Sequence, residues 1–109
     1  MSTSRNVMQE VSPKLAELTS EMLFGDVWER PELSKRDRSL ITVANLVALY
    51  RTDQLRGHIG RALDNGVTKS EISEIILHTT MYAGWPVGAN AVRIAKEVFE
   101  ERASSNPNT

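Results

Sequence analysis

A helix stop signal followed at once by a helix start signal constrains the fold of this chain most strongly. The segment Arg51 to Gly66 reads RTDQLRGHIGRALDNG, and its closing glycine stands where a helix commonly ends in the left-handed conformation. The next residues, Thr68 to Glu71, have the Thr-x-x-Glu pattern of a capping box, in which each side chain binds the other residue's backbone N–H. The sequence therefore predicts that one helix ends at Gly66 and that another begins at Thr68.

Comparable signals divide the rest of the chain into helices. Ser12 can cap a helix whose first residue is Pro13, and Gly25 ends or bends that helix. Ser34 caps the next helix, and Pro86 can begin the last one. The expected helices cover residues 13–25, 34–50, 52–66, 68–84 and 86–102. Since no alternating strand pattern occurs, we expect an all-α bundle of about five to six helices in a single domain, 1–109, with residues 1–11 and 104–109 flexible.

The composition excludes several classes of protein. A net charge of -1 provides no field to attract nucleic acid or anionic lipid, so neither is expected as a partner. The absence of cysteine excludes disulfides, a thiolate nucleophile and a thiolate metal site. No apolar run is long enough to span a membrane, and the N-terminus lacks the apolar core of a signal peptide. We therefore expect a cytoplasmic protein.

The helix that begins at Thr68 is apolar on two sides. Ile72, Ile75 and Ile76 form its main stripe, while Leu77 and Met81 lie nearly opposite. Because one small domain has one core, the second stripe predicts a contact between subunits.

Two polar patterns on these helices are candidates for a site. Arg38, Thr42 and Asn45 form a polar strip on an otherwise apolar helix, and the strip either faces solvent or a neighbouring helix, which is the more common case, or lines a polar pocket. Glu74 and His78 have an i,i+4 spacing that could serve a metal, but two further ligands would be needed. We therefore expect a surface ion pair there and no metal site.

His58 lies at the boundary of an apolar stripe. Leu55 and Ile59 belong to that stripe, and helical geometry directs His58 away from its centre, towards Gln54 and Arg61. A histidine in such a position is more often structural than catalytic. It can nevertheless give or take a proton near neutral pH, so a catalytic role is physically reasonable.

Three segments carry a family resemblance. RPELSKRDRSLITVANLVAL, RTDQLRGHIGRALDNGVTKSEISEIILH and YAGWPVGANA together resemble the carboxymuconolactone decarboxylase family over roughly residues 22–99. The resemblance implies the alkylhydroperoxidase D-like fold, a small all-helical domain that assembles into homotrimers or homohexamers with sites near the subunit contacts.

The same resemblance distinguishes between two branches of the family. In the reductase branch a Cys-x-x-Cys pair precedes the histidine, and here its positions hold Arg51 and Gln54, while the glutamate that assists those thiols falls at Ser39. Thiol–disulfide exchange is thereby excluded. Arg51, Leu55 and His58 look like the Arg, Leu and His of the decarboxylase branch.

The resemblance implies a lyase that needs no cofactor: a decarboxylase of a small carboxylated lactone like 4-carboxymuconolactone, as in the catabolism of aromatic compounds. His58 is then the candidate catalytic residue, as proton donor or oxyanion partner, and Arg51 would lower its pKa in the empty site. The candidate substrate-binding residues are Arg51, Arg38, Thr42, Asn45, His78, Tyr82 and Trp85. For the last three residues, simple helix packing is an equal alternative. The alternative function is a non-catalytic helical oligomer of the same family, used for small-molecule binding or assembly. Convergence of His58, Arg51 and the strip of Arg38, Thr42 and Asn45 on one enclosed pocket would favour the enzyme.

Overall fold

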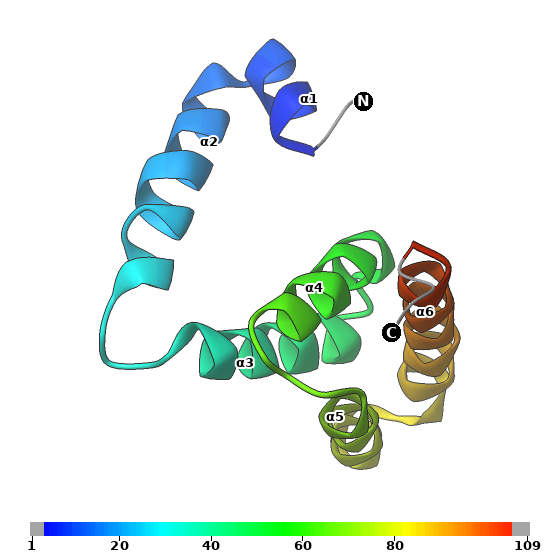
Figure 1. Ribbon diagram of the computed structural model, residues 1–109. Coiled ribbons are helices and arrows are strands. Elements are labelled where there is room, and N and C mark those ends of the chain that lie inside the picture. The colour runs from blue at the N-terminus through cyan, green and yellow to red at the C-terminus, as the bar shows by residue number, and fades with distance from the viewer. Residues whose placement is uncertain (1–3, 106–109) are drawn as a thin grey trace. The chain divides into compact units, whose positions relative to one another are not determined.

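The computed structural model describes residues 4–105, which contain six α-helices and no strand (Figure 1). The all-α prediction is therefore confirmed. In chain order the elements are α1 (Ser4–Val11), α2 (Pro13–Leu18), the π-helix η1 (Thr19–Phe24), the 3-10 helix η2 (Val27–Glu29), α3 (Lys35–Ala48), α4 (Thr52–Asp64), α5 (Lys69–Ala83) and α6 (Trp85–Ser105).

The chain divides into two compact units, an N-terminal unit that ends at Lys35 and a C-terminal unit that begins at Arg36. A single domain over residues 1–109 stays a prediction. The segment 1–11 was expected to be flexible, but α1 forms within it, where Val7 and Val11 have helical spacing. The predicted flexible residues 1–3 and 106–109 lie outside the described part of the chain.

The N-terminal unit continues α2 directly into the π-helix. The Thr19 hydroxyl donates a hydrogen bond to the backbone carbonyl of Leu15 at 2.8 Å, and such back-bonding by threonine often bends a helix. The segment then ends at Gly25, as predicted. Beyond it, Trp28 is buried and packs against the ring of Phe24, with the ring centroids 6.0 Å apart.

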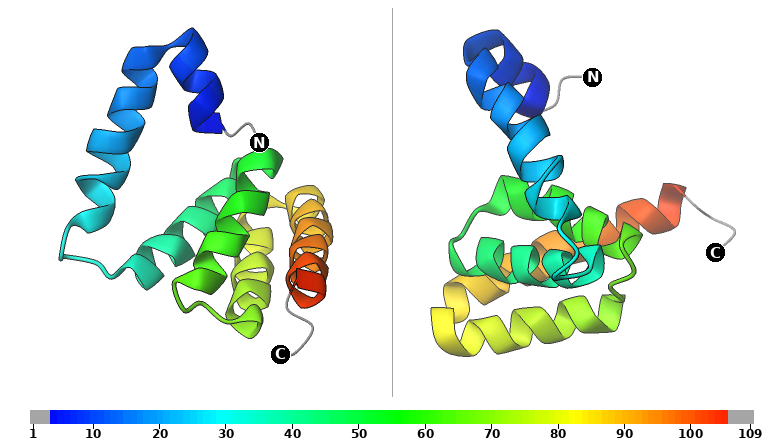
Figure 2. Two further views of the ribbon diagram at one scale, coloured as in Figure 1. Left: turned by 45° about the horizontal axis from the view of Figure 1, so that its top comes forward. Right: turned by 90° about the vertical axis from the view of Figure 1, so that its left-hand side faces the viewer.

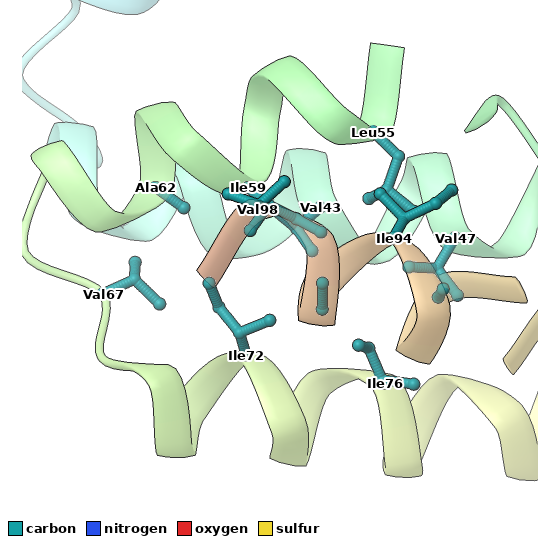
Figure 3. Close-up of a cluster of buried hydrophobic side chains, with 12 residues drawn as sticks. Val43, Val47, Leu55, Ile59, Ala62, Val67, Ile72, Ile76, Ile94 and Val98 are labelled. Atoms are coloured by element: carbon teal, nitrogen blue, oxygen red, sulfur yellow. The ribbon is translucent and has the colours of Figure 1, made fainter. Parts of the chain in front are cut away.

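In the C-terminal unit, α6 packs against both α4 and α5 (Figure 2). Leu55, Ile59 and Ala62 point inward from α4, and Ile72 and Ile76 point towards them from α5 (Figure 3). Valines of α3 and the inner residues of α6 complete this core. Burial of the apolar stripes therefore fixes the rotation of α4, the helix that carries His58.

The predicted boundaries around α4 and α5 are confirmed. Gly66 has a φ of +99°, the left-handed region that glycine adopts without strain. The Thr68 backbone N–H donates to the Glu71 carboxylate at 2.9 Å, and the Glu71 N–H donates to the Thr68 hydroxyl at 3.1 Å. By contrast, α3 ends at Ala48 rather than near Tyr50, because Tyr50 takes a φ of 60° in the turn before α4.

The second apolar stripe of α5 is on the surface of the chain. Leu77 is 54% exposed and Met81 is 53% exposed; we call this pair the outer stripe of α5. It is separate from the stripe of Ile72 and Ile76, which is buried in the core. Among the described residues, no helix combines the length and the apolar character needed to cross a membrane.

Candidate functional site

His58 is half-buried on α4, beside the stripe that faces the core. Its Nδ1 atom is shielded from solvent, while the neighbouring Leu55 and Ile59 are fully buried. The sequence predicted this boundary position from the helical spacing alone. The imidazole of His58 is therefore partly desolvated, but it is not fully buried in the core.

Burial lowers the pKa of His58 below its ordinary value of 6.5, and the positive charge of Arg61 lowers it further. Both effects favour the neutral imidazole, since burial disfavours a charged group and a nearby cation repels imidazolium. The predicted source of this repulsion was Arg51. The structure corrects this, because the cation that acts on His58 is Arg61, one helical turn further along α4.

Two sets of polar contacts hold α4 against α6. Arg56 pairs with Glu97 and, at 3.4 Å, with Glu101. Arg102 donates to the Asp64 carboxylate at 2.9 Å and to the Gly60 carbonyl at 2.8 Å. These contacts lie on either side of His58 along the sequence, so both ends of the segment that carries it are fixed to α6.

The hydrogen bond from Arg102 also lowers the pKa of the Asp64 carboxyl group, as the hydrogen bond from Arg56 lowers that of Glu97. Both carboxylates are therefore charged at neutral pH and each is engaged by an arginine. The sequence does not reveal this arrangement, because the partners are 41 and 38 residues apart and no local spacing marks them.

Arg51 lies outside the helix, as the N-cap residue of α4, and its side chain is exposed. Its backbone angles, φ -94° and ψ 75°, are not helical, so Arg51 does not share a continuous helical face with His58. The cause is the turn at Tyr50, which separates α3 from α4.

The polar strip of α3 is only partly enclosed. Arg38 and Thr42 are half-buried and Asn45 is exposed. The Thr42 hydroxyl donates to the Arg38 backbone carbonyl at 2.8 Å, and the Nε atom of Arg38 is shielded from solvent. The residue after Arg38 is Ser39, whose buried hydroxyl accepts a hydrogen bond from the Asn65 amide at 3.0 Å. Ser39 stands where the family resemblance places the glutamate of the reductase branch, so a neutral hydrogen bond replaces a carboxylate at this position.

His78, Tyr82 and Trp85 occupy other surfaces. The rings of His78 and Tyr82 pack together with centroids 5.2 Å apart, and no ion pair joins His78 to Glu74 within residues 4–105, in contrast to the expected pairing. His78 lines a groove of 370 Å³ between α3 and α5. Trp85 lines a different groove of 380 Å³ along α5 and α6. Neither groove includes His58.

The part of the chain that the structure describes contains no group of three or more histidine, aspartate or glutamate side chains placed to hold a metal ion. The half-buried imidazole of His58, whose pKa is lowered by burial and by Arg61, is of a kind that can serve as an acid, a base or a hydrogen-bonding group. Together these features define a small all-α protein with a half-buried histidine and no thiol.

Residues 13–97 match the model of the Carboxymuconolactone decarboxylase family, and the chain belongs to this family. A 4-carboxymuconolactone decarboxylase of Acinetobacter baylyi is 48% identical over 82 residues, which are 75% of this chain and 61% of that protein. The nitrosuccinic acid decarboxylase npaB of Metarhizium robertsii is 34% identical over 85 residues, which are 78% of this chain and 59% of that protein.

An uncharacterized 15.0 kDa protein of Paracoccus denitrificans is also similar, with 32% identity over 96 residues that make up 86% of this chain and 72% of that protein. The family predicted from the sequence is confirmed. The chain spans about three fifths of the length of the two decarboxylases.

Proposed function

We propose that this chain forms the site of a cofactor-free decarboxylase whose substrate is a small carboxylated lactone like 4-carboxymuconolactone. The observation that carries the proposal is the 48% identity to a 4-carboxymuconolactone decarboxylase over three quarters of the chain. The absence of cysteine agrees with it, because the thiol chemistry of the other branch has no residues to perform it. As a site of aromatic catabolism, it is expected to act in the cytoplasm.

The compounds in the names of the two decarboxylases share their chemistry. Each is a dicarboxylic acid that carries an electron-withdrawing group, a lactone carbonyl in one and a nitro group in the other. The bond between carbon and the departing carboxylate breaks, CO2 leaves, and the electron pair moves into that group. A proton must then be delivered to the carbon, while the second carboxylate stays in the product.

In this reaction His58 donates the proton or binds the developing oxyanion. Its imidazole is neutral in the empty site, because burial and Arg61 lower its pKa. A bound dianion would oppose both effects and favour imidazolium, the form that can give up a proton. Arg51 and Arg38 are proposed to bind carboxylate, and Thr42 and Asn45 to line the substrate site. His78, Tyr82 and Trp85 are not included in this proposal, because His78 and Trp85 line grooves that do not include His58 and Tyr82 packs against His78.

The experiment is to incubate the full chain with 4-carboxymuconolactone and to measure release of CO2. We expect turnover by the wild type and a loss of about 10²–10⁴-fold in His58→Gln, as is typical when a general acid or base is removed. Circular dichroism should show that the variant keeps its helices. Full activity of His58→Gln would show that the histidine only packs, and absence of turnover by the wild type would remove the proposed substrate.

The alternative is a non-catalytic oligomer that uses the family scaffold for binding or assembly. The exposed outer stripe of α5 favours assembly, whether or not the chain is an enzyme. We propose a homotrimer or homohexamer in which this stripe contributes to a subunit contact. Assembly without CO2 release from any carboxylated lactone would favour the alternative.

A further inference from the structure

We propose that Ser39 and Asn65 are a positioning pair, whose hydrogen bond holds the histidine of α4 beside the polar strip of α3. The inference rests on the proposed decarboxylase function. In this role neither residue of the pair touches the substrate, and both act through His58.

The hydrogen bond itself is the first support. The Asn65 side-chain amide donates to the Ser39 hydroxyl oxygen at 3.0 Å. Ser39 is 1% exposed, and a hydroxyl so deeply buried is costly when it lacks a partner. Asn65 is the residue at which α4 ends, and its backbone N–H still donates to the Arg61 carbonyl at 2.9 Å, as in a helix. The bond therefore fixes the end of α4 to the first half of α3.

The hairpin of α3 and α4 is thus held at both ends. At one end only residues 49–51 separate the two helices, and the Arg51 backbone N–H donates to the Leu46 carbonyl at 3.0 Å. Helices joined by so short a loop run in opposite directions, as these two do (Figure 2). At the other end the bond between Ser39 and Asn65 closes the hairpin. His58 lies between these two points, so the turn and the bond together set which part of α3 faces it.

Helical geometry places His58 beside the polar strip. His58 precedes Asn65 by seven residues, so it lies within about 20° of Asn65 around the axis and about 10 Å back along α4. The same distance along α3, measured from Ser39 towards the turn, leads to the segment 42–46. This segment contains two members of the polar strip.

The core occupies the opposite side of the hairpin. Around the axis of α3, the buried valines lie on one side of Ser39, whereas Thr42 and Arg38 lie on the other. The contact between Ser39 and Asn65 therefore marks the line between the apolar and the polar side of the hairpin. His58 lies close to this line, in agreement with its half-buried imidazole. Without the bond the end of α4 could shift against α3, and a misplacement of about 1 Å at a catalytic group can cost about a hundredfold in rate.

The test compares the kinetics of matched variants of the full chain on 4-carboxymuconolactone. Ser39→Ala removes the hydroxyl with little change of volume, and kcat should fall by about tenfold to a hundredfold while KM changes less. Asn65→Asp should keep most of the activity, because the Ser39 hydroxyl can donate to the new carboxylate. Thr80→Val is the control. It also removes a buried hydroxyl, on α5, so it should lower the stability but leave kcat and KM unchanged.

The ring signals of His58, followed by NMR over a pH titration, give a readout that needs no turnover. In Ser39→Ala the pKa of the imidazole should move towards its ordinary value, because the ring gains contact with water. In Thr80→Val it should stay as in the wild type. Asn65→Ala breaks the same bond from its more exposed end, and it replaces Ser39→Ala if that variant does not fold.

The outcomes separate this inference from the proposed function. If the wild type releases CO2 and kcat is unchanged in Ser39→Ala and in Asn65→Ala, the inference is wrong and the function stands. An equal loss of kcat in Thr80→Val would also overturn the inference. If the wild type releases no CO2, the proposed function is wrong and the titration alone decides. An unchanged pKa of His58 in the variants that lack the bond would then exclude the positioning role.

Discussion

The imidazole of His58 makes the stability of the chain depend on pH. Its pKa is lowered in the folded state, whereas in the unfolded chain it returns to about 6.5. As the pH falls, the unfolded state therefore takes up the proton first. The stabilisation of the folded state by the neutral His58 imidazole is present in full above pH 6.5. It is lost as the pH falls from there through the pKa that His58 has in the folded state.

We accordingly expect the free energy of unfolding to decrease as the pH falls below 6.5, and to decrease less in His58→Gln. Urea denaturation at a series of pH values on both sides of the ordinary histidine pKa measures this. His78→Gln, at the exposed histidine of α5, is the matched control. If the free energy of unfolding changed equally with pH in the wild type and in His58→Gln, the lowered pKa of His58 would be wrong.

At the scale of elements, the contact between α5 and α6 depends on the absence of a side chain. A Cβ atom at Gly88 would lie 2.0 Å from the Thr80 hydroxyl oxygen, far inside contact distance. Thr80 cannot easily turn away, because it is buried and its hydroxyl donates to the Ile76 carbonyl at 2.6 Å. The two helices approach as closely as they do because residue 88 is glycine.

We expect Gly88→Ala to lower the free energy of unfolding by about 1–3 kcal/mol, the usual cost of overpacking. Thr80→Ala removes the atoms nearest to the added methyl group, so the double variant should recover much of that loss, and a double-mutant cycle in urea measures the coupling. Additive effects of the two substitutions would show that the helices move apart instead.

The boundaries of α4 and α5 were predictable because their signals are local. Thr68 and Glu71 make the reciprocal bonds of the capping box, and Gly66 takes the left-handed conformation, as the sequence implied. The helix α1 was not predicted, because residues 1–11 were expected to be flexible. The π-helix was not predicted either, because Leu15, Leu18, Met22 and Leu23 keep the spacing of an ordinary helix through this segment.

The site was predictable only in part. The boundary position of His58 follows from spacing, which depends on the helix alone. The backbone of Arg51 could not be predicted, because it follows the turn at Tyr50, whose positive φ no residue type announces. The i,i+3 spacing of His58 and Arg61 was visible in the sequence, but only the structure shows that this cation perturbs the imidazole.

At the scale of the whole molecule, the outer stripe of α5 predicts self-association. We expect light scattering at micromolar concentration to give the mass of a trimer or hexamer. Replacing Leu77 and Met81 by glutamate should shift that mass towards the monomer, because charges would be buried in the contact. Leu49→Glu, at an exposed apolar position of the turn after α3, is the control and should leave the mass unchanged. A monomeric wild type would exclude the proposed assembly.

The two tryptophans give each unit its own optical reporter. Trp28, in the N-terminal unit, is 7% exposed, whereas Trp85, at the start of α6, is 69% exposed. On unfolding, fluorescence emission should move to longer wavelength mainly through Trp28, since Trp85 is already in contact with water. Far-ultraviolet circular dichroism instead follows mostly the four longer helices of the C-terminal unit. If residues 1–109 form one cooperative domain, the two denaturation curves should coincide, and an emission shift at lower urea would show that the N-terminal unit melts first.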